Sequence, residues 1–370
     1  MVTREEIHSD LAIPPGEFLA EVLDDLGMSQ ADLARRMGRP TQAINEIVKG
    51  AKALIPETAL QLEQVVGVPA HVWLGLEAEY RLVGARRREE QQVKQETRLL
   101  PSFPYAEMVK LGCLPAERKA EDKVRQLRRF FNVASLQQLG QLPAYAPAFR
   151  LGGTREASGY GLAAWLHCGQ LEAARVTVQA FDRTKLTVLV PGLRSLTSAP
   201  AYQVATELRS RLAECGVVFT LFLHFPKTYG HGATFWTQPG KKAVLLMSNR
   251  GRYADIFWFS FFHELGHILK HGNSATFVEI TDDAGEKTPQ EAEANQFARD
   301  TLIPPAPYQA FTLAGQFTRE AITRFALSVG IHPGIVVGRL QHEGQVLHRT
   351  YLNGLRERWD LNGDTAEPAA

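Results

Sequence analysis

A glutamate set between two histidines, in the segment His263-Glu264-Leu265-Gly266-His267, constrains the fold of this chain more than any other feature. Residues four apart lie on one face of an α-helix, so both imidazoles could reach a single metal ion if the segment is helical. Buried imidazoles without partners are costly, so the motif predicts a metal site, with histidines satisfied by ordinary core hydrogen bonds as the alternative. The flanking residues predict a buried helix over residues 255–270, because they are mostly apolar: Ile256, Phe257, Trp258, Phe259, Phe261, Phe262, Ile268 and Leu269.

Zinc is the metal that this motif predicts, since Zn²⁺ favours imidazole nitrogen and needs no redox chemistry, and Mn²⁺ is the alternative. Glu264 follows the first histidine directly. We expect its carboxylate to accept a proton from water and to pass it to a leaving amine, as a general base and acid do in peptide hydrolysis. His271 lies four residues beyond His267, just before Gly272. It is predicted to cap the end of the helix and not to bind the metal.

A catalytic zinc site takes three protein ligands, so a third ligand is required. The segment EAEANQFA, residues 291–298, offers Glu291 and Glu293 on a second predicted helix over residues 289–301. Successive helical residues turn by about 100°, so these two carboxylates point to nearly opposite sides. Glu291 shares its face with Asn295 and with two alanines, which permit close approach to the first helix. We therefore expect Glu291 to bind the metal, Asn295 to orient a ligand imidazole, and Glu293 to lie in solvent without a role.

Residues 29–49 have the pattern of a helix, a tight turn and a second helix. Ser29 is suited to cap the first helix, Gly38-Arg39-Pro40 forms the turn, and the second helix begins near Thr41. In a helix-turn-helix domain the second helix enters the major groove, where Gln and Asn pair with adenine while Arg and Lys hold phosphates or guanine. A helical hairpin without any role in DNA binding is the alternative. The residues expected to contact double-stranded DNA are Arg39, Thr41, Gln42, Asn45, Lys49 and Lys52.

The length of 370 residues predicts two or three domains. We expect an all-helical domain over residues 1–83, a helical connector over 84–185 that starts with a charged segment, and the metal domain over 186–360. Strands are expected at residues 186–190, 217–224 and 243–248, where short apolar runs occur. The predicted fold class is α+β, mostly α, with a small sheet in the metal domain.

Composition limits where such a chain could act. The formal net charge is +1, so affinity for nucleic acid must come from a local basic face. The three cysteines are scattered and form no CxxC pair, which argues against a disulfide framework and suits a reducing cytoplasm. The first residues, MVTREEIHSD, lack an apolar signal core, and no apolar run approaches the ~20 residues of a membrane helix. We expect a soluble cytoplasmic protein, associated with the nucleoid when it is bound to DNA.

The segment from Arg252 through Asp255 and the HELGH motif to EAEANQFA and Leu302-Ile303-Pro304 resembles the ImmA/IrrE metallopeptidases. The resemblance covers about residues 186–350. These gluzincin-type bacterial enzymes inactivate transcriptional repressors by cutting them. The resemblance implies that His263, His267 and Glu291 bind the metal and that Glu264 is the general base. Residues 331–340 are similar to the family's C-terminal signature, so we expect His332 to stabilise an oxyanion, and a simple turn residue before Pro333 is the alternative.

The N-terminal part is similar to the XRE-type HigA antitoxins, on the segments 15–17, 27–30, 33–34, 44–47, 50–52 and 57–59. Those regulators bind palindromic operators as dimers, so the resemblance implies a homodimer on double-stranded DNA.

Three functions follow as hypotheses. The first is a zinc-dependent endopeptidase that cleaves a repressor or an antitoxin and also binds DNA sequence-specifically to regulate transcription. The second is a HigA-like antitoxin and autorepressor whose metal domain is a sensor or partner-binding module without turnover. The third is self-cleavage in the charged segment at residues 81–100. Glu264 favours the first, because a metal sensor has no physical need for a general base.

Overall fold

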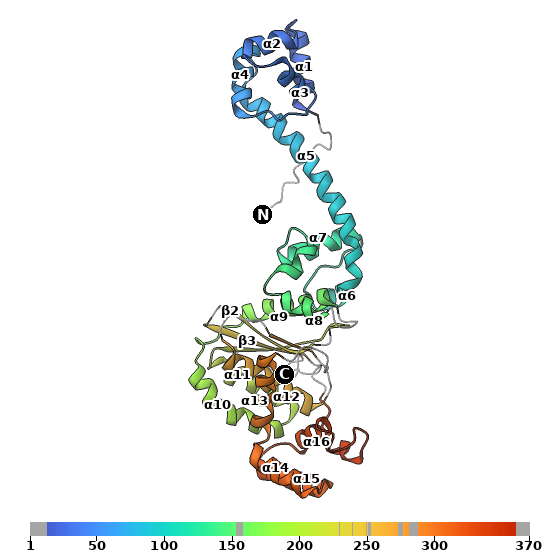
Figure 1. Cartoon of the computed structure of the whole chain (residues 1–370), viewed down its shortest axis with the longest axis vertical. Coiled ribbons are helices and arrows are strands. Elements are labelled where there is room, and N and C mark those ends of the chain that lie inside the picture. The colour runs from blue at the N-terminus through green and yellow to red at the C-terminus, as the bar shows by residue number, and fades with distance from the viewer. Residues whose placement is uncertain are drawn as a thin grey trace, which may run out of the picture. The chain divides into compact units, whose positions relative to one another are not determined.

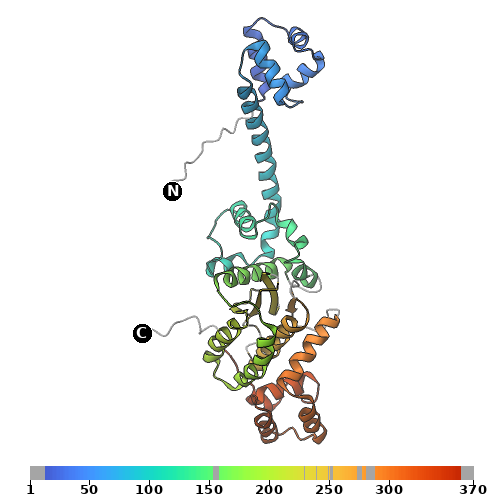
Figure 2. The same ribbon diagram turned by 90° about the vertical axis from the view of Figure 1, so that its left-hand side faces the viewer.

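A computed structural model of the chain describes residues 13–152, 158–228, 230–238, 240–248, 250, 253–272, 277–280 and 288–359. Arg252, which contributes to the family resemblance, and the N-terminal segment MVTREEIHSD lie outside the described residues. The chain divides into two compact units, Met1–Thr97 and Arg98–Ala370, which are drawn in Figures 1 and 2. This division differs from the expected three segments, because one helix continues unbroken past residue 83 and the expected connector shares its packing with the sheet.

The first unit is all-helical. Over its described residues, 13–97, the helices are α1 (Pro15–Asp25), α2 (Gln30–Met37), α3 (Thr41–Val48), α4 (Pro56–Val66) and α5 (Ala70–Glu96). Ser29 caps α2, since its hydroxyl oxygen accepts a hydrogen bond from the Asp32 backbone N–H at 3.1 Å. Leu33, Ile44 and Trp73 are fully buried in a core that all five helices share. The burial follows the helical period of the sequence, which is why the predicted pair of helices at residues 29–49 corresponds to α2 and α3.

The second unit combines helices with a small sheet. Helices α6 (Tyr105–Lys110), α7 (Ala120–Phe131), α8 (Ala146–Gly152), α9 (Gly159–Arg175), α10 (Arg183–Ser195) and α11 (Ala201–Ala213) precede the sheet in the chain. The strands are β1 (Val217–Phe222), β2 (Gly230–Gln238), β3 (Lys242–Ser248) and β4 (Phe277–Ile280). Helix α12 (Ala254–Lys270) lies between β3 and β4 in sequence. Helices α13 (Pro289–Leu302), α14 (Pro305–Ala314), α15 (Arg319–Val329) and α16 (Pro333–His342) follow.

The sheet has the strand order β1-β3-β2-β4, with β1 parallel to β3, and β2 antiparallel to both β3 and β4. Successive residues of a strand face opposite sides. Leu245 of β3 packs in the core that contains α12, whereas its neighbour Leu246 meets Gly169 of α9. The sheet therefore lies between α9 and α12, as Figure 1 also shows. The fold is mostly helical with a small mixed sheet, as predicted.

One predicted strand is wrong. Residues 186–190 belong to α10, whose first turn is capped by Asp182, the acceptor of a 3.0 Å hydrogen bond from the Lys185 backbone N–H. Leu186 and Leu193, seven residues apart, are buried, whereas Val188 is 76% exposed. That burial pattern fits two helical turns, and a short apolar run does not distinguish a strand from a helix. Strands β2 and β4 were not predicted.

Helix α12 runs through the middle of the second unit's core. Its aromatic residues pack on one another and on the chain's C-terminal segment, where Trp359 lies 5.1 Å from Phe257 between ring centroids. Asp255, in the first turn, receives two hydrogen bonds from the Arg356 guanidinium, from Nε at 3.0 Å and from Nη2 at 2.8 Å. Both side chains are largely buried. The C-terminal segment thus holds the start of the helix that carries the histidine motif.

Among the described residues, no single helix has the length and apolar character needed to cross a membrane. The pair formed by α15 and α16, which is bent by 111°, passes that test by length and composition only.

Candidate metal centre and DNA-binding unit

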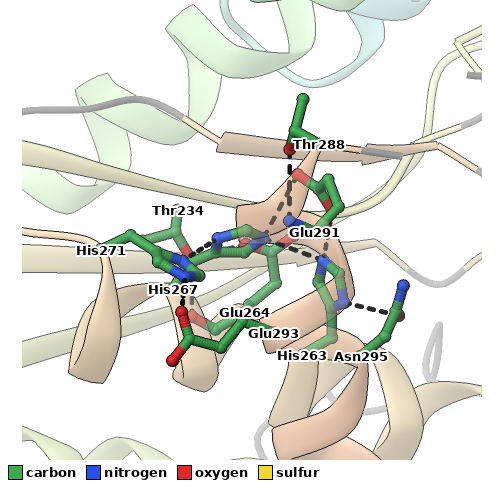
Figure 3. A network of polar contacts seen from close by, with 9 residues as sticks. All are labelled: Thr234, His263, Glu264, His267, His271, Thr288, Glu291, Glu293 and Asn295. Carbon is green, nitrogen blue, oxygen red and sulfur yellow. Dashed lines mark hydrogen bonds and ion pairs between the residues drawn. The ribbon is translucent and has the colours of Figure 1, made fainter. Parts of the chain in front are cut away.

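The two histidines of the motif lie on one face of α12, with their imidazoles turned toward each other (Figure 3). The Nε2 atoms of His263 and His267 are 3.0 Å apart, and the two side chains are 2% and 1% exposed. The helix forms here because its inward positions are filled by large apolar residues that join the core of the unit. The ordinary helical spacing of four residues therefore brings two nitrogen donors to one point.

Helix α13 supplies a carboxylate to the same point. Glu291 Oε2 is 3.1 Å from His263 Nε2, and Glu291 Oε1 is 3.4 Å from His267 Nε2. The helix begins at Pro289, and its N-cap is Thr288, whose hydroxyl oxygen accepts a hydrogen bond from the Glu291 backbone N–H. The ligand atoms of His263, His267 and Glu291 all lie within 4.8 Å of one another. Within the described ranges, no other group of three His, Cys, Asp or Glu residues meets this condition.

Small residues allow α12 and α13 to approach closely enough for this arrangement. A Cβ atom at Gly266 would lie 3.3 Å from the Ala294 Cα and 3.1 Å from Phe297 Cδ1. Ala294 and Ala298 are fully buried between the helices. A larger side chain at any of these positions would push the helices apart and remove Glu291 from the histidines. The alanines on the same face as Glu291 therefore allow the close contact between α12 and α13.

The outer nitrogen of each imidazole also has a partner. His263 Nδ1 lies 3.0 Å from the Asn295 amide oxygen, so Asn295 holds the position expected of it. His267 Nδ1 lies 2.8 Å from His271 Nδ1, and His271 Nε2 lies 3.1 Å from Glu293 Oε2. His271 is the C-cap residue of α12, as predicted, but its contacts with His267 and Glu293 were not predicted. Partners of this kind fix which ring nitrogen carries the proton.

Glu264 is fully buried beside the ligand cluster, on the side of the sheet. The Thr234 hydroxyl, on β2, donates a hydrogen bond to Glu264 Oε2 at 2.6 Å. Gly232, two residues earlier on the same face of β2, leaves room for the carboxylate, since a Cβ there would lie 2.7 Å from Glu264 Cγ. Sequence reasoning missed both residues because it found no strand at 230–238. The alternation in Gly232-Ala-Thr234-Phe was the signal that could have found them.

The carboxylate of the cluster is held in its charged form. Burial raises the pKa of Glu291, but hydrogen bonds from His263 and His267 outweigh it and lower that pKa to about 2. Burial lowers the pKa of His267, although the contact with Glu291 acts in the opposite direction. The lowered pKa favours the neutral imidazole. Anionic carboxylate and neutral imidazole are the protonation states in which these groups bind a metal ion.

The donor set fits zinc. Two imidazole nitrogens and one carboxylate are the three protein ligands of several catalytic zinc sites, which keep a further coordination position open. The Glu291 side chain is 30% exposed, so the cluster is accessible from solvent on that side, while the histidines are buried. The second ring nitrogens are already engaged, which leaves Nε2 of each ring turned toward the centre.

His332 is not one of the three grouped ligands, and its stabilisation of an oxyanion stays a prediction. Its Nδ1 accepts a hydrogen bond from the Gly334 backbone N–H at 3.1 Å and so caps α16. It lies near Asp255, where burial raises the carboxyl pKa while Arg356 and His332 oppose that shift. Asp255 precedes His263 by eight residues, about 12 Å along a helix. The structure thus places His332 as the N-cap before Pro333, the first residue of α16.

In the first unit, the residues expected to contact DNA lie on or beside α3. Thr41, Gln42, Lys49 and Lys52 are exposed. Asn45 and Arg39 are half-buried: Asn45 donates to Gln30 on α2 at 3.3 Å, and Arg39 donates to Gln61 on α4 at 2.6 Å. The six residues therefore do not form one uniformly free face. Their contacts with DNA stay a prediction.

Comparisons with known proteins match each unit separately. Residues 19–73 match the helix-turn-helix family, and residues 213–332 match the family described as IrrE N-terminal-like domain. The HTH-type transcriptional regulator YddM of Escherichia coli is 33% identical over 73 residues, which are 20% of this chain and 78% of that protein. Virulence-associated protein I of Dichelobacter nodosus is 38% identical over 72 residues, which are 19% of this chain and 67% of that protein.

Two solved structures are also similar. An addiction module antidote protein of a HigA family from Coxiella burnetii is 34% identical, and the match covers 23% of this chain and 94% of that one, with a TM-score of 0.22. The Pseudomonas aeruginosa antitoxin HigA, solved with the higBA promoter, is 30% identical over 23% of this chain and 95% of that one, also with a TM-score of 0.22.

The first unit is thus a DNA-binding regulator domain and the second is a domain of a metallopeptidase family. The chain belongs to the XRE-type helix-turn-helix regulators through its N-terminal domain and carries a C-terminal IrrE/ImmA-like peptidase domain.

Proposed function

We propose that this protein is a zinc-dependent endopeptidase that cleaves a transcriptional repressor or an antitoxin, and that it couples this cleavage to sequence-specific DNA binding. The observation that carries the proposal is the convergence of His263, His267 and Glu291 beside the buried Glu264. A structural metal site would need no buried general base next to its ligands.

His263, His267 and Glu291 would hold the ion, and zinc would supply Lewis acidity to a peptide carbonyl. Glu264 would take a proton from the attacking water and deliver it to the amine that leaves. Thr234 supports this role because its hydrogen bond to Oε2 fixes the orientation of the carboxylate.

The DNA-binding half of the proposal assigns operator contacts to α3 and its flanks. Thr41, Gln42 and Asn45 would read bases, and the cations Arg39, Lys49 and Lys52 would hold phosphates. We propose a homodimer on the operator, because a two-fold arrangement of half-sites doubles the contact surface of a small domain. Cytoplasmic localisation belongs to the same proposal.

The test uses the full chain loaded with zinc and a proteome-derived peptide library of its host, read by mass spectrometry of new N-termini. Glu264→Gln should keep its zinc and produce no new N-termini, because an amide cannot carry the proton. The same assay detects self-cleavage within residues 81–100. If wild type and Glu264→Gln give identical N-termini, the peptidase assignment is wrong, and the autorepressor without turnover becomes the better account.

A further inference from the structure

Two further side chains, His271 and Glu293, continue the contacts of His267 on the side away from the other ligands (Figure 3). His271 Nδ1 is 2.8 Å from His267 Nδ1, and Glu293 Oε2 is 3.1 Å from His271 Nε2. The His271 side chain is 4% exposed, whereas that of Glu293 is 51% exposed. The line therefore begins at a proposed ligand in the core and ends in a carboxylate at the surface.

The chemistry of imidazole fixes the protons along this line. A contact of 2.8 Å between two ring nitrogens needs one donor and one acceptor. A His267 that presents a lone pair on Nε2 carries its proton on Nδ1, so His271 Nδ1 must accept. His271 then carries its own proton on Nε2, where the Glu293 carboxylate accepts it. Each ring is thus held in a single tautomer. Because the Glu293 carboxylate can only accept, it sets which nitrogen donates and which accepts in both hydrogen bonds.

We infer that His271 and Glu293 are positioning residues of the metal centre, which hold His267 in the tautomer and orientation that bind zinc. This inference rests on the proposed zinc-dependent function. It revises the expectation that Glu293 has no role. The helical geometry correctly turned Glu293 away from Glu291, but the side to which it points contains the end of α12, with His271.

A simpler account makes Glu293 an ordinary surface partner of Lys270, whose Nζ lies 3.2 Å from Glu293 Oε1. Hydrogen bonds from Lys270 and then from His271 lower the pKa of Glu293. Exposed ion pairs contribute little to stability, and nothing in such a pair would affect a metal ion. The two accounts therefore differ in one measurable quantity, the affinity for zinc.

The experiment measures the zinc Kd of the full chain by competition with a chromophoric chelator. His271→Ala should weaken zinc binding about 10- to 100-fold and Glu293→Ala about tenfold, which is the range found when such outer partners are lost. His271→Asn should restore most of the affinity, because its amide oxygen can accept where Nδ1 did. Two controls should leave the Kd unchanged. Lys270→Met removes the ion pair and the contact of the ammonium with the Phe297 ring, but keeps the His271–Glu293 contact. Asp300→Asn changes another carboxylate of α13, which is half-buried and accepts a hydrogen bond from Gln296.

The outcomes separate this inference from the proposed function. If wild type binds no zinc, the proposed function itself fails. If wild type binds zinc and both alanine variants bind it equally well, only the positioning role is refuted. Equal weakening by Lys270→Met would also refute it, because the ion pair alone would then explain the effect.

Two cysteines that are far apart in the sequence, Cys113 and Cys168, lie next to each other in the fold. Cys113 lies in the turn after α6 and Cys168 lies on α9, and their sulfur atoms are 3.1 Å apart. Cys168 is buried, whereas Cys113 is partly accessible. A disulfide needs the sulfurs about 2.05 Å apart, so a movement of about one ångström would close the bond. The third cysteine, Cys215, is buried elsewhere.

We propose that Cys113 and Cys168 form a dithiol site that peroxide oxidises to a disulfide. The Cys113 thiol loses its proton, its thiolate attacks one peroxide oxygen, and the O–O bond breaks. A sulfenic acid forms, and the departing hydroxide takes up the lost proton to give water. The Cys168 sulfur then attacks the sulfenic sulfur, the S–S bond forms and a second water leaves. Two thiols and one hydrogen peroxide thus give one disulfide and two waters. The hydrogen bond from Cys168 lowers the pKa of Cys113, which suits Cys113 as the first nucleophile.

The test treats the full zinc-free chain with hydrogen peroxide, alkylates the remaining thiols and maps the peptides by mass spectrometry. We expect one cross-linked pair containing residues 113 and 168, reversed by a dithiol reductant, with Cys215 alkylated throughout. Cys215→Ser should form the same cross-link at the same rate. Cys113→Ser should abolish it and leave Cys168 alkylated after unfolding. Two free thiols in peroxide-treated wild type, or cross-links equally shared with Cys215, would overturn the proposal.

Discussion

The metal centre and the DNA-binding unit differ in how firmly neighbouring residues hold their candidate functional side chains in place. Around the metal centre each candidate residue is held by another: His263 by Asn295, His267 by His271 and Glu264 by Thr234. In the DNA-binding unit, by contrast, Gln42 of α3 is exposed, as are Lys49 and Lys52, which follow the helix. A metal ion needs ligands fixed to within fractions of an ångström, whereas phosphates can be held by mobile cations. Substitutions should therefore have sharp effects in the second unit and graded effects in the first.

The largest effect is expected at the ligands. His263→Ala or His267→Ala should remove zinc completely, because the remaining two donors cannot hold the ion against solvent. Elemental analysis after dialysis measures this loss. Because the DNA-binding unit contains no ligand of the metal, we expect both variants to bind the DNA upstream of their own gene with wild-type affinity. A variant that keeps stoichiometric zinc would disprove the ligand assignment.

A large effect is also expected where the C-terminal segment holds α12. Arg356→Ala leaves the buried Asp255 carboxylate without its partner, which should destabilise the second unit by about 3–5 kcal/mol. Hydrogen exchange resolved by peptide, in increasing urea, should show this loss in α12 and α13. The helices of the first unit should keep their protection. Unchanged exchange in α12 would mean that the ion pair does not support the metal helix.

A smaller effect is expected on DNA binding. Gln42→Ala and Asn45→Ala should each cost about 1–3 kcal/mol of discrimination between the operator and unrelated DNA. Lys52→Ala should instead weaken binding to both DNAs alike and reduce the salt dependence. Titrations at two salt concentrations separate these cases. Equal discrimination in the Gln42→Ala, Asn45→Ala double variant would move base recognition away from α3.

The smallest effect is expected at the N-cap of α2. Ser29→Ala removes the acceptor for the Asp32 backbone N–H and should cost about 1 kcal/mol of stability, as loss of such caps usually does. Hydrogen exchange in the helices of the first unit, recorded at increasing urea concentration, measures this loss of stability. Zinc affinity should stay at the wild-type value. A change in zinc affinity would show that the two units are coupled, and the contrast between them would then need revision.

Local geometry explains what could be predicted from the sequence. The spacing of His263 and His267, and the face shared by Glu291 and Asn295, depend only on the helical period, and the structure brings all four side chains together. Thr234 and the pair Cys113 and Cys168 depend on the packing of distant segments, which periodicity does not encode. The error at residues 186–190 has a related cause, since a five-residue apolar run fits both a strand and a helix. The role of His332 was assigned from resemblance alone and stays a prediction, whereas its N-cap contact on α16 is local and is seen directly.

The bond between Arg356 and Asp255 has a consequence for the order of events during synthesis. A chain leaves the ribosome from its N-terminus, and domains generally fold as they emerge. All five helices of the first unit are available once Thr97 has emerged. Helix α12, however, lacks the partner of Asp255 until Arg356 has been added, about a hundred residues after Asp255 itself. A nascent chain would thus hold a finished DNA-binding domain long before it holds a firmly anchored metal helix.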